Sequence, residues 1–514
     1  NVAVGMQALN SETANGGNIA IGYLALGTLN AGGDAYNTAV GHKAGNLLST
    51  GTHNNLIGGF AGDALTTGAS NVAIGYNALG AEDTGNRSIA IGEGTLQVQN
   101  NDANNYNIAI GHHAGHVIST GTLNTLIGGL AGDAITEGHS NVAVGYQALS
   151  TNVDGDGNTA VGYSALFALE PSDGLSYNTA LGYNTGVSLS TGTQNTLVGA
   201  NAGDSLTTGT NNVAIGFEAL ASEDGHSYNV AVGHRTLKNQ DAGGNAYNTA
   251  LGYNAGLVVS TGGQNTLVGG LAGDALTTGG HNVAIGYLAL SAEDTGSYNI
   301  AIGAHALKLA DAGTNAYNVS IGYNSSTALT TGLYNTALGS EALKTNEDGD
   351  KNTAIGFRAL KSFEADTDGH GNNVAVGANA AENMSTGTEN VAVGQSAIGS
   401  GVTTGNNNIA IGSFAGNSLT SGEANALIGK FAGDALTTGS NNIAIGYEAL
   451  TTEDGSGRNI AIGSNALTNQ NAGGNAHNIA IGHNAGLNVT TGSNNTIVGG
   501  LAGENITDAT FNTL

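Results

Sequence analysis

The stretch NTALGYNAGLVVSTGGQ at 248–264 is followed without a break by NTLVGGLAGDALTTGGH at 265–281 and NVAIGYLALSAEDTGSY at 282–298. Each stretch has 17 residues. It begins with Asn, has small or apolar residues at its third and fourth positions, and has Gly at its fifth. A fourth stretch, NIAIGAHALKLADAGTNAY at 299–317, has 19 residues and completes a unit of about 70 residues. Repetition at a short period is the signature of a repeat architecture.

The motif Asn-x-Ala-(Ile/Val)-Gly, with Leu allowed at its apolar places, starts thirty times between Asn1 and Asn512. Only Ser88 replaces the leading Asn. Of the 29 intervals, 21 are 17 residues long and the others are 18 to 21 residues long. No linker or change of composition interrupts the pattern, so a single continuous array over 1–514 is predicted.

Each repeat places β-branched residues at alternate positions, as in Val283 and Ile285, and then a turn glycine such as Gly286. Seventeen residues are too few for a pair of helices but suit short strands and turns. Such a unit buries its apolar side chains only by stacking on its neighbours. The sequence therefore predicts an all-β fold, a parallel β-solenoid (β-roll) of about 30 coils of 17–21 residues.

The side chains of the motif lead to two expectations. Ile, Val or Leu at the fourth place, such as Ile74, Val144 and Ile445, should line the interior, while the small Ala before it should pack against something on the other face. The leading Asn should form a hydrogen-bonded structural ladder, because its amide can bond both backbone and the next Asn. This ladder is predicted for Asn71, Asn141, Asn212, Asn282 and Asn442.

These motifs are similar to known repeats. The NVAIG step at 71–75 and the NIAIG step at 107–111 resemble the head repeats of YadA-type trimeric autotransporter adhesins. The longer NTAVGYSAL at 158–166 resembles repeat arrays of phage tail fibres and related bacterial surface proteins. The resemblance implies a left-handed β-roll in which three identical chains lie side by side, outside the cell on a bacterial surface or phage virion. The coils here are longer than those of the adhesin heads.

Composition excludes several classes of function. The formal net charge is −27, and the 11 Lys and Arg residues are scattered, which disfavours nucleic acid and anionic membranes as partners. No Cys is present, and no stretch reads as a membrane span or a signal peptide. The chain starts in register with the repeat and ends partway through a coil. It is therefore expected to be the middle of a longer protein.

Two acidic turns are candidate calcium sites, although no other cofactor is expected. Alternating acids before Gly begin oxygen-ligand calcium loops. Asp154 and Asp156 have this spacing, as do Asp366 and Asp368, but neither turn has the Glu that ends such a loop. Solvated turn acids are the alternative interpretation.

Other titratable groups do not predict catalysis. Glu-Asp pairs recur at 82–83, 223–224, 293–294 and 453–454, but an active site is normally a single event, so the chain is expected not to be an enzyme. His112, His113 and His116 form the one His cluster. His112 and His113 are expected to face opposite sides of a strand and so not to share a metal.

All 17 Tyr residues stand either five places after the leading Asn or directly before it. The two positions are expected to lie close together along a strand edge and to form an aromatic stripe. Exposed aromatic rows are plausible sugar-binding platforms, and Tyr76, Tyr146, Tyr287 and Tyr447 are the candidate glycan-facing residues. Ladder packing at a coil corner or between chains is the favoured alternative.

The sequence thus predicts an extracellular structural fibre or adhesin shaft or head, a homotrimer that serves surface attachment or recognition of a host receptor or glycan. An end-to-end polymerising filament or sheath subunit is the first alternative. A calcium- or ice-binding solenoid is the second. Rows of Thr suited to ice recur in only one coil of four, as Thr-Thr-Gly at 66–68 and 277–279.

Overall fold

The computed structural model describes residues 1–13, 16–171, 174–365 and 370–514. These residues form 29 strands of three residues each and no helix, in two compact units, Asn1–Thr261 and Gly262–Leu514. This confirms the predicted all-β parallel solenoid. The described part of the chain therefore contains no helix that could cross a lipid bilayer.

The first unit contains strands β1 to β15: β1 Val2–Val4, β2 Ile19–Ile21, β3 Thr38–Val40, β4 Asn55–Ile57, β5 Val72–Ile74, β6 Ile89–Ile91, β7 Ile108–Ile110, β8 Thr125–Ile127, β9 Val142–Val144, β10 Thr159–Val161, β11 Thr179–Leu181, β12 Thr196–Val198, β13 Val213–Ile215, β14 Val230–Val232 and β15 Thr249–Leu251. The second unit contains strands β16 to β29: β16 Thr266–Val268, β17 Val283–Ile285, β18 Ile300–Ile302, β19 Val319–Ile321, β20 Thr336–Leu338, β21 Thr353–Ile355, β22 Val374–Val376, β23 Val391–Val393, β24 Ile409–Ile411, β25 Ala426–Ile428, β26 Ile443–Ile445, β27 Ile460–Ile462, β28 Ile479–Ile481 and β29 Thr496–Val498.

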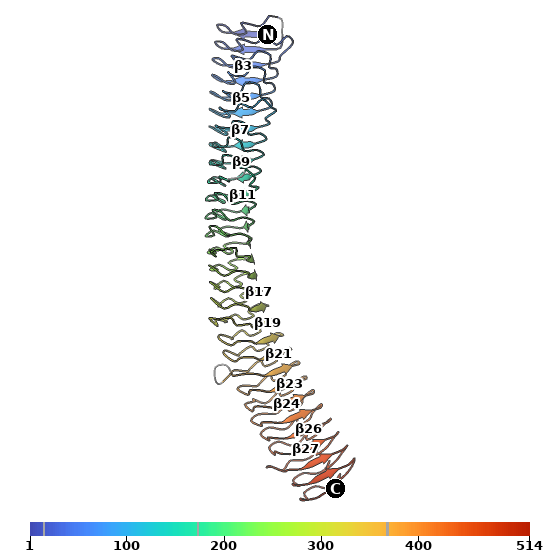
Figure 1. Ribbon diagram of the computed structural model, residues 1–514. Coiled ribbons are helices and arrows are strands. Elements are labelled where there is room, and N and C mark those ends of the chain that lie inside the picture. The colour runs from blue at the N-terminus through green and yellow to red at the C-terminus, as the bar shows by residue number, and fades with distance from the viewer. Residues whose placement is uncertain (14–15, 172–173, 366–369) are drawn as a thin grey trace. The chain divides into compact units, whose positions relative to one another are not determined.

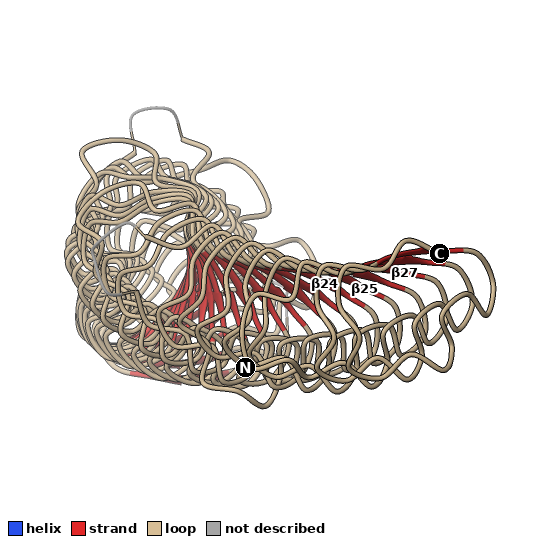
Figure 2. Ribbon diagram, turned by 90° about the horizontal axis from the view of Figure 1, so that it is seen from below, coloured by secondary structure: helices blue, strands red, loops and turns tan. Residues whose placement is uncertain are grey.

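Successive strands pair in parallel within each unit, and equivalent motif positions lie opposite one another. In the first unit Ala73 of β5 lies opposite Ala90 of β6, and in the second Ala284 of β17 lies opposite Ala301 of β18. The coils of each unit follow one another as a stack (Figure 1). The strands lie side by side along one side of the coils, and turns and loops make up the rest of each coil (Figure 2).

The direction in which the strand side chains point is the opposite of the prediction. The central Ala is buried, as in Ala73, whereas Ile74 and Val144 are only partly buried and Ile445 is 36% exposed. The leading Asn points inward, and side chains alternate along a strand, so the residue two places later must also point inward. The fourth-place Ile, Val or Leu consequently faces outward, and the Ala is not available to pack against another chain.

The interior is filled in two complementary ways in neighbouring coils. The coil at 265–281 buries Leu267 and Leu276 and has Gly273 between them. A Cβ atom at Gly273 would lie 2.8 Å from methyl carbons of both leucines. The coil at 282–298 has Ala284 and Leu290 at the first two of these places and buries Glu293 at the third.

The leading Asn residues form a hydrogen-bonded column inside each unit. The backbone N–H of Asn71 donates to the side-chain oxygen of Asn54 at 3.0 Å, and the side-chain oxygen of Asn71 accepts the N–H of Ser88 at 2.9 Å. The Asn71 amide nitrogen donates to the carbonyl of Gly85 at 2.9 Å. The same donor and acceptor pattern is found at Asn141, Asn212, Asn282 and Asn442. Buried amides paired in this way fix the register of each coil on the next.

Candidate functional site

The outward-facing residues of the strands form an exposed apolar surface, which we call the outer strand face. It consists of the first and third residues of each strand, at which Ile, Val and Leu predominate. Those at least 36% exposed are Val2, Val4, Ile19, Ile21, Ile57, Ile127, Leu181, Ile215, Val230 and Leu251 in the first unit and Ile285, Leu338, Ile409, Ile411, Ile443, Ile445, Ile481 and Val498 in the second. Large exposed apolar surfaces mark sites of association.

The tyrosines form two rows, one at each end of the strands, and not the single stripe that was expected. Tyr146, Tyr163 and Tyr183 stack from coil to coil in the row that follows the strands, with ring centroids 5.6 and 5.3 Å apart. In the other row His281 and Tyr298 stack at 4.8 Å, and Tyr298 and Tyr317 at 5.0 Å. The three residues of each strand separate the rows.

The four candidate glycan-facing tyrosines lie in the row that follows the strands. Tyr76, Tyr146, Tyr287 and Tyr447 are between 47% and 59% exposed. These rings also pack on neighbouring coils, as the alternative interpretation requires. Tyr146 stacks on Tyr163, whereas Tyr76, Tyr287 and Tyr447 meet an aromatic ring of an adjacent coil edge to face. Each of the four rings is therefore both exposed and in contact with a neighbour.

The predicted calcium residues of the first acidic turn do not converge. The Asp154 carboxylate accepts a hydrogen bond from the Thr136 hydroxyl at 3.0 Å, and that of Asp156 accepts the backbone N–H of His139 at 2.6 Å. Within the described ranges, neither belongs to a group of three ligand-bearing side chains. Asp366 and Asp368 lie outside the described residues.

The His cluster is also arranged differently from the prediction. The rings of His112 and His113 stack at 4.0 Å, and those of His113 and His116 at 4.4 Å, on one side of the coil. The prediction was wrong because the strand ends at Ile110 and His113 has a left-handed φ of 55° within a turn. Burial, followed by the neighbouring imidazoles, lowers the pKa of His113. The stacked rings do not bring three ligand atoms together.

Buried glutamates are the feature that sequence reasoning missed. Glu82, Glu223, Glu293 and Glu453 are fully buried at the position that Leu65 and Leu276 occupy in other coils. The Glu82 carboxylate accepts hydrogen bonds from the backbone N–H of Gly85 at 2.7 Å and from the amides of Gln99 and Asn105, each at 2.9 Å. Burial raises the pKa of Glu82, Glu223 and Glu293. The burial of these glutamates could have been predicted by aligning the coils, because each Glu stands at a place where other coils have a core Leu.

Two of these glutamates belong to larger groups of titratable side chains. Glu223 lies with Asp224, His226 and Asp241, and Glu293 lies with Asp294 and Asp311. In each group the potential ligand atoms are all within 4.8 Å of one another. The aspartates of both groups are exposed at coil corners, whereas the Glu is inside.

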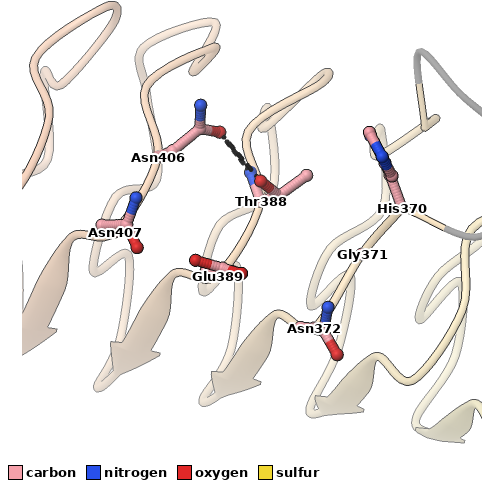
Figure 3. Close-up of a pocket in the computed structure, with 7 residues that line it drawn as sticks. All are labelled: His370, Gly371, Asn372, Thr388, Glu389, Asn406 and Asn407. Atoms are coloured by element: carbon pink, nitrogen blue, oxygen red, sulfur yellow. Dashed lines mark hydrogen bonds between the residues drawn. The ribbon is translucent and has the colours of Figure 1, made fainter.

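A polar hollow lies at the corners of three successive coils in the second unit (Figure 3). It is lined by His370, Gly371, Asn372, Thr388, Glu389, Asn406 and Asn407. The Asn406 side-chain oxygen accepts hydrogen bonds from the backbone and hydroxyl of Thr388 at 2.7 and 3.1 Å. The side chains in Figure 3 are spread along the edges of the coils.

No protein-family model matches this chain, and no curated protein is significantly similar to it.

Proposed function

We propose that the chain is an extracellular structural fibre or adhesin shaft, not an enzyme, in which three copies associate side by side. It would act mechanically, holding apart or displaying the surfaces that attach a bacterium or phage virion to a host. The uniform coils support this role, because the same turns and faces recur along both units. The choice of three copies and of a left-handed coil rests on the resemblance to adhesin heads.

The outer strand face is the observation that carries the proposal. Its Ile, Val and Leu side chains recur from coil to coil in register, so an identical chain alongside would meet apolar residues at matching intervals. Burying this surface is favourable by roughly 25 cal/mol per Å² of apolar area. The association surface proposed here is therefore the Ile and Val face and not the buried Ala.

Molar mass by light scattering after size exclusion tests the assembly. We expect a value near three times 50.5 kDa for the wild-type chain. Replacing Ile411 and Ile445 together by Lys should weaken the trimer, because both side chains are exposed on the outer strand face. Val402→Lys is the matched control, since Val402 is 63% exposed but lies outside the strands. A wild-type monomer would contradict the proposal, and open-ended growth would favour the filament alternative.

The Tyr rows supply a proposed recognition surface for glycans on the same fibre. Their rings are exposed and repeated, as a sugar-stacking platform requires. We expect binding on a glycan array that is reduced when Tyr146 and Tyr163 are both replaced by Ala. Unchanged binding would assign the rows to packing alone.

A further inference from the structure

Two equivalent acidic corners differ in what faces their carboxylates. Glu223, Asp224 and Asp241 form the corner in the first unit, and the same places of the second unit hold Glu293, Asp294 and Asp311. Each corner combines one buried Glu with two exposed Asp, and one Asp comes from the following coil.

In the first unit, side chains of the protein satisfy the buried glutamate. The His226 imidazole bonds directly to the Glu223 carboxylate, and its Nδ1 lies 3.9 Å from an oxygen of Asp224 and 3.9 Å from one of Asp241. Gln240 donates its amide to the other oxygen of Glu223 at 2.9 Å. An imidazole that can carry positive charge thus stands among three carboxylates.

In the second unit, both of these partners are replaced by residues without a polar side chain. Gly296 stands at the place of His226, and Ala310 at the place of Gln240. The Glu293 Oε1 atom accepts the backbone N–H of Gly296 at 2.6 Å. The Oε2 atom makes no hydrogen bond within the described residues, although Glu293 is 0% exposed. A buried carboxylate oxygen without a partner is costly.

The two exposed aspartates add like charge to this corner. The pKa of Asp311 is raised, first by partial burial of its carboxyl group. The charge of Asp294 and a hydrogen bond with that residue raise it further. Burial is also the first cause of the raised pKa of Glu293, and the charges of Asp311 and Asp294 add to it. The backbone N–H groups of Gly296 and Ala312 lower it. The backbone of Asp294 is held in place, because its carbonyl accepts the backbone N–H and the hydroxyl of Thr277.

We propose that Glu293, Asp294 and Asp311 bind a calcium ion, which takes the place that the His226 imidazole has in the first unit. Calcium prefers six to eight oxygen ligands at about 2.3–2.6 Å, so two ligands of one ion lie no more than about 5 Å apart. The three carboxylates meet this limit, with ligand atoms within 4.8 Å of one another. Water completes the coordination on the exposed side. The proposal does not depend on the number of copies in the assembly.

Calorimetric titration of the calcium-free full-length chain tests the site. We expect one saturable calcium ion per chain and a higher unfolding temperature when calcium is present. Asp311→Asn removes the negative charge of one ligand, and it keeps the fold because Asn100 and Asn471 occupy this place in other coils. Changing even an outer-shell partner costs about 10–100-fold in metal affinity, so loss of this charge should weaken binding by a similar factor.

Two further variants separate the site from general surface charge. Asp241→Asn removes the equivalent charge at the His226 corner and should leave calcium affinity unchanged. Gly296→His places an imidazole where His226 stands in the first unit and should abolish the saturable ion while circular dichroism stays that of the wild type. Absence of saturable binding by the wild-type chain would overturn the proposal. Equal affinity of wild type and Asp311→Asn would overturn it too.

Discussion

The neighbouring coils at 265–281 and 282–298 fill the same interior with different residues. The first uses Leu267, Gly273 and Leu276, and the second uses Ala284, Leu290 and Glu293 at the same three places. The backbone is nevertheless alike, since Gly273 and Leu290 have left-handed φ angles of 55° and 53°. Packing of Leu290 in the core offsets a strain of about 1–3 kcal/mol that a glycine avoids. The coil geometry is therefore fixed, while the side chains that fill it are exchangeable as sets.

The largest loss of stability is expected at the glycine that follows each strand, where no other side chain can be accommodated. Gly286 has a φ of 135°, and a Cβ there would lie 2.6 Å from the carbonyl carbon and oxygen of Gly303 in the next coil. Gly286→Val should cost more than about 4 kcal/mol, because backbone strain and overpacking add. Gly313→Ala is the control, since Gly313 also has positive φ but nothing lies within 4 Å of its Cβ position. Chemical denaturation measures both, and similar losses would show that the contact with Gly303 is unimportant.

A smaller effect is expected from converting one coil type into the other. Leu267→Ala leaves a cavity in the core and should cost about 2–5 kcal/mol. Gly273→Leu alone should be destabilising, because the new side chain meets Leu267 and Leu276. The double variant restores the combination found at Ala284 and Leu290. It should be less destabilised than the sum of the single variants in a double-mutant cycle of unfolding free energies. Strict additivity would contradict the exchange of side chains as sets.

The smallest change in the free energy of unfolding is expected from titration of the buried glutamates. They stand at the place that holds Leu276 in one coil and Glu293 in the next. The folded-state pKa of Glu82, Glu223 and Glu293 lies above the ordinary value, so the native chain binds more protons than the unfolded chain just above that value. The free energy of unfolding should therefore fall as pH rises through this interval. In calcium-free buffer we expect a lower unfolding temperature at pH 7 than at pH 5.

Glu293→Gln should reduce this pH dependence, because Gln does not titrate at the buried position. Exposed Asp508, in contrast, is a control whose replacement by Asn leaves the buried carboxylates in place. Thermal unfolding followed by circular dichroism at the two pH values makes the measurement. A wild-type chain that is more stable at pH 7 than at pH 5 would contradict the direction inferred from the raised pKa values.

The fold was largely predictable, and the sites were not. The in-register starts and the turn glycines were enough to predict parallel coils, because a short apolar unit has few other ways to bury its side chains. The facing of the strands was predicted wrongly, since Ile was assigned to the interior by its hydrophobicity. The buried Asn71, three residues before Ile74, is the better guide to the facing of the strand. Alternation from an inward Asn places Ala73 inside and Ile74 outside.

The acidic corner at Glu293 was also not predictable from the sequence. Asp154 and Asp156 were predicted as calcium ligands because they are close in sequence, but their carboxylates bond to separate groups. Glu293 and Asp311 are 18 residues apart in the sequence and come together only because one coil stacks on the next. A search for ligands within one turn could not find this group.

The sequence by itself determined the repeat, the parallel stacking and the column of inward Asn residues, because these depend on local turns and a constant coil length. Only the tertiary structure decided which side of each strand faces solvent and which carboxylates of adjacent coils meet. Both depend on pairing across coils, which brings residues 17 to 21 positions apart into contact. The burial of Glu293, one of whose oxygens has no hydrogen-bond partner among the described residues, arises from that pairing.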